Sequence, residues 1–191
     1  MECALRVVVK RLSLVVLLAC AGVLASAQDV NARRVRGIVG QKAPALDVNT
    51  WFNLAPGKKS VRLKDMRGKV MMLFFFQSWC PGCHSRGFPT LQMMQRHYAQ
   101  ASDVGFLVVQ TVFEGFGTNT ARRAKRETDK LALTIPVGHD AGPNKSGSRV
   151  MKRYRSGGTP WIVIIDKKGV VRYNAFHIRP KQAITLMDSL R

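Results

Sequence analysis

The hydrophobic pattern of the chain predicts strands that are buried on both faces. The runs 70–77 (VMMLFFFQ) and 104–112 (VGFLVVQTV) are continuously apolar, which is typical of strands at the centre of a sheet with both faces covered. Residues 161–166 (WIVIID) and 170–176 (VVRYNAF) flank a Lys-Lys-Gly turn and predict a hairpin. A short extended segment is expected at 134–140 (TIPVGHD).

Helical periodicity appears between these strands. Leu91, Met94 and Tyr98 recur at intervals of three and four, which predicts a helix over residues 88–100 with one buried face. Its methionines are expected to be core residues. Further helices are predicted at 118–133, 148–155 and 181–190. The order β-α-β-α, hairpin, helix predicts an α/β fold with helices on both faces of a central sheet.

The first 27 residues have the pattern of a secretory signal peptide. Three basic residues precede an apolar run at 12–19, and the small residues Ala25 and Ala27 place the expected cleavage before Gln28. The apolar run is short for a membrane span. We therefore expect an exported protein that is located in the periplasm.

Other N-terminal arrangements stay open: a retained signal anchor, and a lipid-modified Cys20. In either case the mature chain would be attached to a membrane. Residues 28–43 are polar and basic without a clear period, and we interpret them as a flexible basic tether. The folded domain is expected to begin at Pro44 and to span residues 44–191.

The cysteine count points to chemistry rather than to structural cross-linking. The chain has four cysteines, and Cys3 and Cys20 lie in the expected signal peptide. The mature protein would keep only Cys80 and Cys83. A disulfide between residues three apart closes too small a loop to stabilise a domain appreciably, so we expect this pair to react.

The chain is strongly basic, with a formal net charge of +20. Nucleic acid is not expected as a partner, because no basic strip interleaved with aromatic residues is present. For an exported protein, peripheral contact with an anionic membrane or an acidic partner fits this charge better. A merely solvated basic surface is a third interpretation.

The cysteines form the motif Cys80-Pro81-Gly82-Cys83, between a predicted buried strand and a predicted helix. The amides at a helix N-terminus stabilise a thiolate, so Cys80 is the expected nucleophile. Cys83, one turn further on, is expected to be more buried and to resolve the mixed disulfide. Pro81 suits the start of a helix. Trp79 is expected to pack beside the nucleophile.

The same motif has two other interpretations. Residues 80–84 read C-x-x-C-H, the attachment signature of a c-type haem. A haem protein needs an axial ligand and is mostly helical around the macrocycle, whereas strands and helices alternate here. Zinc is disfavoured because no second C-x-x-C or H-x-x-x-H is present. We expect no cofactor and no metal.

Three segments resemble the thioredoxin-like superfamily, and in particular exported TlpA-type disulfide reductases. They are RLKDMRGKVMMLFFFQSWCPGC (62–83), YRSGGTPW (154–161) and IVIIDKKGVV (162–171). The resemblance implies a central mixed sheet flanked by helices, with the C-x-x-C at the N-terminus of the first core helix. It also implies that Pro160 is cis and lies opposite the dithiol. Thr159 would then pair with the substrate backbone.

A related fold, the peroxiredoxin, is a further alternative. That chemistry uses a Thr three residues before the reactive cysteine, and this chain has Gln77 there. Peroxidase activity is therefore not expected.

The chain departs from the pattern of the family at three positions. Phe74 stands where thioredoxins carry a buried acid, and Arg86 stands where TlpA-type reductases often have Glu. The helix proline, Pro89, comes one residue later than usual, so Gly87 or a local bulge has to absorb the additional residue.

His84 and Arg86 are the candidates to compensate for the missing acid. As cations they would stabilise the Cys80 thiolate and make the pair more oxidising than thioredoxin. An equally supported interpretation is that His84 is simply an exposed first-turn residue.

These observations predict an exported thiol-disulfide oxidoreductase that acts on protein disulfide substrates, as a reductase. Its electron donor would be a membrane thiol protein, and a monomer is expected. The alternative is a thioredoxin-like binding or redox-sensing module that recruits an acidic partner.

Overall fold

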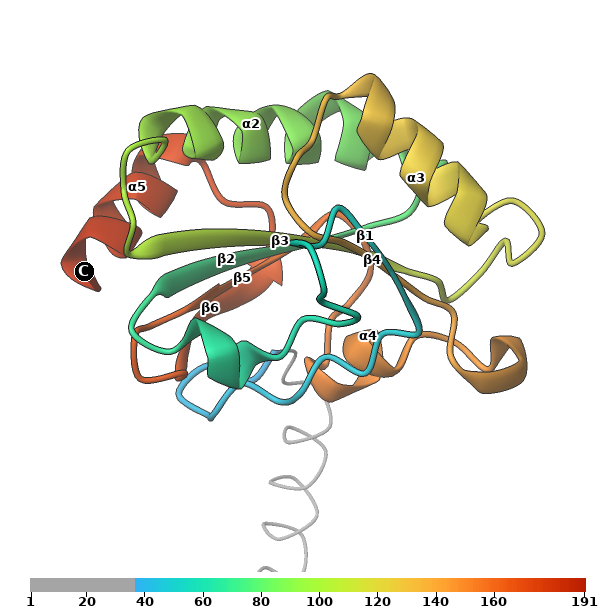
Figure 1. Ribbon diagram of the computed structural model, residues 1–191, viewed down its shortest axis with the longest axis horizontal. Helices are drawn as coiled ribbons and strands as arrows, with labels where there is room; N and C mark the ends of the chain where they lie inside the picture. Colours follow the sequence, from blue (N-terminus) through green and yellow to red (C-terminus); the bar gives the residue numbers. More distant parts are fainter. Residues whose placement is uncertain (1–36) are drawn as a thin grey trace, which may run out of the picture. The chain divides into compact units, whose positions relative to one another are not determined.

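The computed structural model describes residues 37–191, and within them six strands form one sheet (Figure 1). The strand order is β1-β4-β3-β2-β5-β6. The pairs β2–β3 and β3–β4 are parallel, whereas every pair that involves β1, β5 or β6 is antiparallel. The expected mixed sheet is confirmed. Its strands are β1 (Thr50–Phe52), β2 (Val70–Phe76), β3 (Val104–Thr111), β4 (Val137–Asp140), β5 (Trp161–Ile165) and β6 (Val171–Phe176).

The central strand β2 is buried along its whole length. Because side chains alternate along a strand, β2 contributes to two separate hydrophobic clusters. Met72 and Phe74 point into the cluster on one face, and Leu73 and Phe75 point into the cluster on the other. This double burial explains why the sequence of β2 is apolar without interruption.

Helices cover the two faces of the sheet unequally (Figure 1). On one face, α2, α3 and α5 bury Leu91, Ala124 and Met187 against the first cluster. On the other, the short α4 buries Val150 and Tyr154 against the second cluster. The helices are α2 (Phe88–His97), α3 (Ala121–Lys130), α4 (Arg149–Arg153) and α5 (Pro180–Ser189), with 3-10 turns η1 (Leu63–Met66) and η3 (Pro143–Lys145).

The helices begin where side chains cap their first amides. The Thr120 hydroxyl accepts a hydrogen bond from the Arg123 amide at the start of α3. Ser148 caps α4 in the same way, and its hydroxyl donates to the buried Asp140 carboxylate at 2.7 Å. The helix α3 is shorter than the predicted segment 118–133, because it starts after this cap and ends at Lys130.

The folded unit begins earlier than Pro44, where the sequence suggests a domain boundary. Ile38 is buried in the second cluster. The Gly40 amide donates to the Val171 carbonyl at 2.8 Å, and the Ala43 amide donates to the Gly169 carbonyl at 2.9 Å. Residues 37–43 of the expected tether are thus packed on the sheet. The expected signal peptide and residues 28–36 lie outside the described residues.

One strand of the sheet was not predicted. β1 has only three residues and pairs with β4, with Trp51 opposite Gly138. In residues 37–191 no helix is both long and apolar enough to cross a membrane.

Candidate active site

The two cysteines lie just beyond the end of β2. After Phe76, a turn leads to Cys80, whose amide donates to the Gln77 carbonyl at 3.1 Å. The first core helix starts at Pro81, where a missing amide hydrogen costs nothing. The amides of Cys83 and His84 then donate to the Cys80 carbonyl at 3.1 and 3.3 Å. The C-x-x-C therefore lies at the N-terminus of this helix, as expected.

The two thiols differ in exposure. Both are free cysteines, and Cys80 is 6% exposed whereas Cys83 is fully buried. The Cys83 amide donates to Cys80 Sγ at 3.3 Å, an interaction that favours negative charge on that sulfur. Burial raises the pKa of the Cys83 thiol far above its ordinary value, and the hydrogen bond with Cys80 raises it further. Cys80 is thus the more exposed of the two buried cysteines, and Cys83 holds its proton firmly.

The peptide bond between Thr159 and Pro160 is cis, as the resemblance implies. The Cys80 thiol donates to the Thr159 carbonyl at 3.5 Å. Pro160 packs against the first turns of the helix. A β carbon added at Gly82 would lie 3.4 Å from Pro160 Cδ, and one added at Gly87 would lie 3.2 Å from Pro160 Cβ.

The expected bulge before Pro89 is confirmed. Cys83–Gly87 forms a π-helical turn, η2, which accommodates one residue more than an α-helical turn. A side chain at Gly87 has no space, because an added β carbon would lie 2.5 Å from the Phe74 ring. The extra residue is therefore absorbed by the π turn, and a glycine is needed at its end.

Phe74 fills the volume where the family places a buried acid. Its side chain is fully buried, and its ring meets the Phe88 ring edge to face at 5.0 Å. Within the described residues, the groups that shift the pKa of Cys83 are Cys80, Gln77 and Thr159, with no carboxylate among them. A protonated Cys83 therefore has no neighbouring acid to assist its ionisation.

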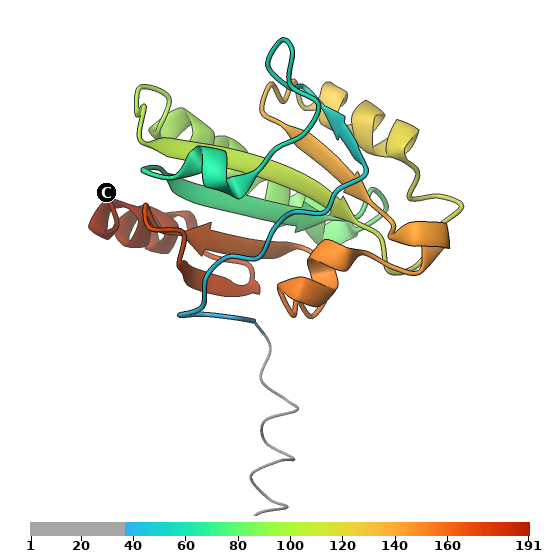
Figure 2. The ribbon, with the colours of Figure 1, turned by 60° about the horizontal axis from the view of Figure 1, so that its bottom comes forward.

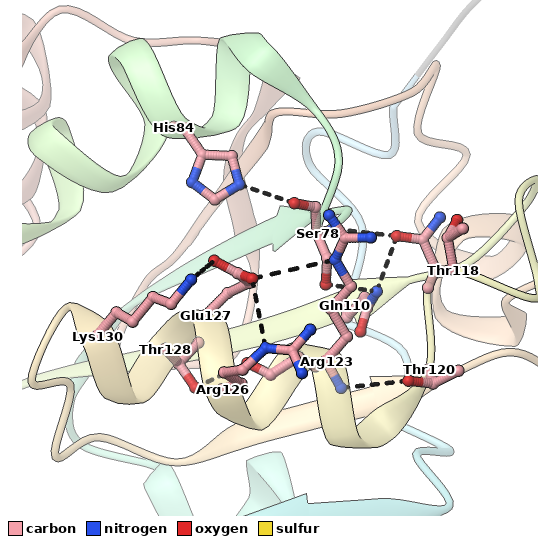
Figure 3. A network of polar contacts seen from close by, with 12 residues as sticks. Ser78, His84, Gln110, Thr118, Thr120, Arg123, Arg126, Glu127, Thr128 and Lys130 are labelled. Atoms are coloured by element: carbon pink, nitrogen blue, oxygen red, sulfur yellow. Dashed lines mark hydrogen bonds and ion pairs between the residues drawn. The ribbon is translucent and has the colours of Figure 1, made fainter.

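Ser78, two residues before Cys80, is held at all three of its polar groups. Its amide donates to Asn119 Oδ1 at 3.0 Å, and its hydroxyl accepts from Gln110 Nε2 at 3.0 Å. Its carbonyl oxygen is 2.9 Å from His84 Nε2. Figure 3 shows the His84 ring directed at Ser78, with Gln110 on the opposite side. Three separate segments thus position the turn that carries the dithiol.

The contacts of Asn119 and Gln110 extend this polar group into the interior. Asn119 Nδ2 donates to Gln77 Oε1 at 3.0 Å, and Gln110 Nε2 also donates to Asn119 Oδ1 at 3.0 Å. Gln110 Oε1 lies 3.2 Å from His139 Nδ1. Because a carbonyl oxygen only accepts, the Nδ1 of His139 carries the hydrogen. Burial lowers the pKa of His139, which favours its neutral form.

The contacts of His84 specify its tautomer as well. A carbonyl oxygen accepts only, so Nε2 of His84 carries the hydrogen that is donated to Ser78. The ring also lies 5.5 Å from the Phe88 ring. Arg86 is exposed on the same turn. Burial lowers the pKa of His177, and the charge of Arg86 lowers it further, so His177 at the end of β6 lies within electrostatic reach of η2.

Exposed aromatic rings lie near the dithiol. Trp79 is 45% exposed, and its Nε1 would be 3.8 Å from a β carbon at Gly115, which places it beside the loop after β3. Phe176 is 47% exposed and would be 3.1 Å from a β carbon at Gly158, beside the cis peptide. These rings offer apolar contact area close to Cys80.

Sequence reasoning missed Ser78, Gln110, Asn119 and Phe176. One of them carries a signal in the sequence, because Gln110 interrupts an apolar strand. In the described part of the chain, no group of three or more His, Cys, Asp or Glu is arranged to hold a metal ion.

Comparison with known proteins gives the family. A model described as the AhpC/TSA family matches residues 39–174, more than half of the chain. The chain belongs to the AhpC/TSA family. This AhpC/TSA-family protein is 29% identical over 133 residues to the thioredoxin-like protein YneN of Bacillus subtilis, covering 70% of this chain and 68% of YneN. It is 27% identical over 161 residues to the thiol-disulfide oxidoreductase ResA of Oceanobacillus iheyensis, covering 84% and 77% of the two chains.

Solved structures agree with this assignment. The AhpC/TSA-family protein superposes on the thioredoxin-like superfamily protein SPOA0173 with a TM-score of 0.72 and 32% identity, covering 78% of this chain and 95% of the other. It superposes on a thiol-disulfide isomerase from Corynebacterium glutamicum with a TM-score of 0.68 and 32% identity, covering 78% and 96%. The thioredoxin-like fold expected from the sequence is confirmed.

Proposed function

We propose that this protein is a thiol-disulfide oxidoreductase that reduces disulfides in protein substrates through Cys80 and Cys83. The observation that carries the proposal is the asymmetry of the pair. Cys80 keeps a small exposed fraction, at the helix N-terminus and beside the Thr159 carbonyl, whereas Cys83 is fully buried and its pKa is raised. Cys80 is therefore suited to attack the substrate disulfide, and Cys83 stays protonated until the resolving step. The names of its relatives support the same chemistry.

The reaction proceeds in two exchange steps. The Cys80 thiolate attacks one sulfur of the substrate disulfide, that S–S bond breaks, and the other substrate sulfur leaves as a thiolate that takes up a proton. Cys83 then loses its proton and attacks Cys80 Sγ. This second step releases the remaining substrate thiolate and leaves a Cys80–Cys83 disulfide. Two electrons pass to the substrate, and an external dithiol is needed to reduce the enzyme again.

Thr159, Pro160 and Trp79 are proposed to contact the substrate. The Thr159 carbonyl lies beside Cys80, so a substrate amide bound there would bring its disulfide next to the nucleophile. The exposed Trp79 ring supplies apolar contact. We further propose that the protein is exported to the periplasm as a monomer and is reduced there by a membrane thiol protein. The signal pattern of residues 1–27 supports this location.

Trapping and turnover together test the proposal. Cys83→Ser should accumulate mixed disulfides on Cys80, because the resolving thiol is lost. Insulin reduction should disappear in Cys80→Ser and stay unchanged in Ser189→Ala, a control at an exposed residue at the end of α5. Reduction that survives Cys80→Ser would contradict the proposal. Absence of turnover in the wild type, together with tight capture of a single partner, would support a binding or sensing module instead.

A further inference from the structure

A hollow of about 910 Å³ lies on the face of the sheet that carries α4. Its apolar floor includes Leu46, Val61, Met71 and Ile165, which belong to the second hydrophobic cluster or its edge. Figure 2 shows the segment of residues 37–69, coloured blue to teal, crossing this face. This segment, which contains the short η1 turn, covers the sheet at the hollow, so the sheet is less protected there than on the side with α2, α3 and α5.

The rim of the hollow carries a strong excess of positive charge. Both of its carboxylates are occupied, because Asp47 pairs with Arg153 at 2.6 Å and Asp166 pairs with Arg172 at 2.8 Å. Of the rim cations, Arg62 pairs with Asp65 at 2.8 Å. Among residues 37–191, no ion pair is formed by the other rim cations, which are Lys42, Lys64, Arg67, Lys69, Arg149 and Lys168.

A second strongly basic surface, on α3, has most of its cations in ion pairs. Glu127 forms ion pairs of 4.0 Å or less with Arg123, Arg126 and Lys130. Figure 3 shows these side chains around it. Lys125 pairs with Asp129 at 2.6 Å. The rim of the hollow therefore differs from α3 in that most of its cations form no ion pair, and the field of several unpaired cations attracts a surface that presents many anions at once.

The position of the hollow favours a membrane as that surface. The described chain begins at Gly37 and reaches the rim directly, since Lys42 bridges to Val170 beside it. The 36 residues before Gly37 include the apolar run 12–19. If the chain stays attached to a membrane through that run, the folded domain is kept close to lipid headgroups, whose phosphates present many anions at once.

The dithiol lies at the opposite end of β2 from the hollow. Met71 lines the hollow near the start of the strand, whereas Cys80 is the fourth residue after the end of the strand at Phe76. Seven strand residues span about 20 Å. Contact at the hollow would therefore leave the dithiol directed away from the surface.

We propose that this basic-rimmed hollow docks on a membrane surface rich in anionic phospholipid. The lipid phosphates bind the exposed cations Lys64, Arg67, Lys69 and Lys168, and the apolar floor receives the lipid portion next to the headgroup. This inference concerns a surface remote from the dithiol and stands independently of the proposed redox function.

Vesicle binding of the full chain tests the proposal. The vesicles contain either phosphatidylglycerol mixed with phosphatidylcholine or phosphatidylcholine alone. Each Lys or Arg near an anionic surface strengthens binding about fivefold. The variant with Lys64, Arg67, Lys69 and Lys168 all changed to Gln should lose at least about 50-fold in binding to the anionic vesicles. It should retain wild-type insulin reduction.

A matched control variant removes the same charge elsewhere. Arg96, Arg122, Lys145 and Lys181 are exposed and form no ion pair in the described residues, and changing all four to Gln should weaken vesicle binding much less. Equal loss in the two variants would overturn the proposal, since the attraction would then depend on net charge alone. Loss of binding to a soluble polyglutamate peptide, with vesicle binding intact, would identify an acidic protein as the occupant and also overturn it.

Amide hydrogen exchange is a second test. It reports contact at the hollow even if the N-terminal segment alone is enough to bind every variant to the vesicles. On anionic vesicles, amide hydrogen exchange should slow at residues 60–69 and stay unchanged in the loop 113–119 near the dithiol. On phosphatidylcholine vesicles, residues 60–69 should exchange as in solution. Unchanged exchange at residues 60–69 on the anionic vesicles would contradict docking through this surface.

Discussion

The thiol of Cys80 donates a hydrogen bond to the carbonyl oxygen of Thr159 at 3.5 Å, across a sequence separation of 79 residues. The sulfur and the carbonyl come from distant parts of the sequence. Cys80 follows β2, and Thr159 lies in the segment before β5. The sheet brings them together because β2 and β5 are antiparallel neighbours, with Phe75 opposite Trp161. A substrate backbone bound to this carbonyl is thereby delivered to the nucleophile.

The resolving step should accelerate as the pH rises. The pKa of Cys83 lies far above neutrality because the thiol is buried, so over the neutral range its thiolate fraction increases about tenfold per pH unit. Stopped-flow measurement of substrate release from a preformed mixed disulfide should show this slope. Cys83→Ser is the control, since release should then be slow at every pH. A wild-type rate that does not change with pH would contradict a protonated Cys83.

Substitution of Gly87 by Ala should destabilise the domain by about 1–3 kcal/mol. The added β carbon would lie 2.5 Å from the Phe74 ring and 3.2 Å from Pro160 Cβ, and both neighbours are confined. This clash outweighs the higher helix propensity of Ala, which favours it by about 1 kcal/mol. Chemical denaturation measures the loss. Gly117→Ala is the matched control, because no atom lies within 4 Å of its added β carbon. Equal stability of both variants would show that η2 relaxes freely.

Asn119→Ala should cost about 1–3 kcal/mol and slow insulin reduction. The substitution leaves the Ser78 amide and the Gln77 side chain without a buried partner, so the turn before Cys80 loses its anchor. Asn49→Ala is the comparison, because Asn49 is exposed and binds only the Arg149 side chain. We expect the latter to change stability by less than about 1 kcal/mol. An active, fully stable Asn119→Ala protein would rule out the anchoring role of this residue.

Replacement of His84 by Ala should make the dithiol more reducing, by on the order of 10–20 mV. The contribution proposed for His84 is to favour the reduced, thiolate form of Cys80, so its removal shifts the equilibrium toward the disulfide. Titration of the wild type and the variant against glutathione measures the two potentials. His97→Ala, at the other end of α2, serves as the control. An unchanged potential would show that His84 does not tune the dithiol and serves only to hold the Ser78 carbonyl.

Much of the fold could be read from local patterns. The uninterrupted apolar run of β2 predicts double burial, and the spacing of Leu91, Met94 and Tyr98 predicts the buried face of α2. The late position of Pro89 predicts an additional residue in the helix, which the π turn contains. These properties follow from the sequence because periodicity and capping act between residues that are close along the chain.

Other features depend on contacts between distant segments. β1 is three residues long and is a strand only because β4 offers it a free edge. From the sequence, Ile38 belongs to a polar tether. In the structure it is buried, because the backbone of the residues that follow it forms hydrogen bonds with the hairpin of β5 and β6.

The sequence by itself therefore determined the order of strands and helices, the site of the dithiol and the expectation of a proline opposite it. The tertiary structure decided which side chains surround that dithiol. Asn119, Gln110 and His84 converge on Ser78 only because a parallel strand pair and a π turn bring their backbones together. The free cations of the hollow likewise gather from four separate segments. Such a cluster leaves no periodic signal in the sequence, because each segment contributes only one or a few of its residues.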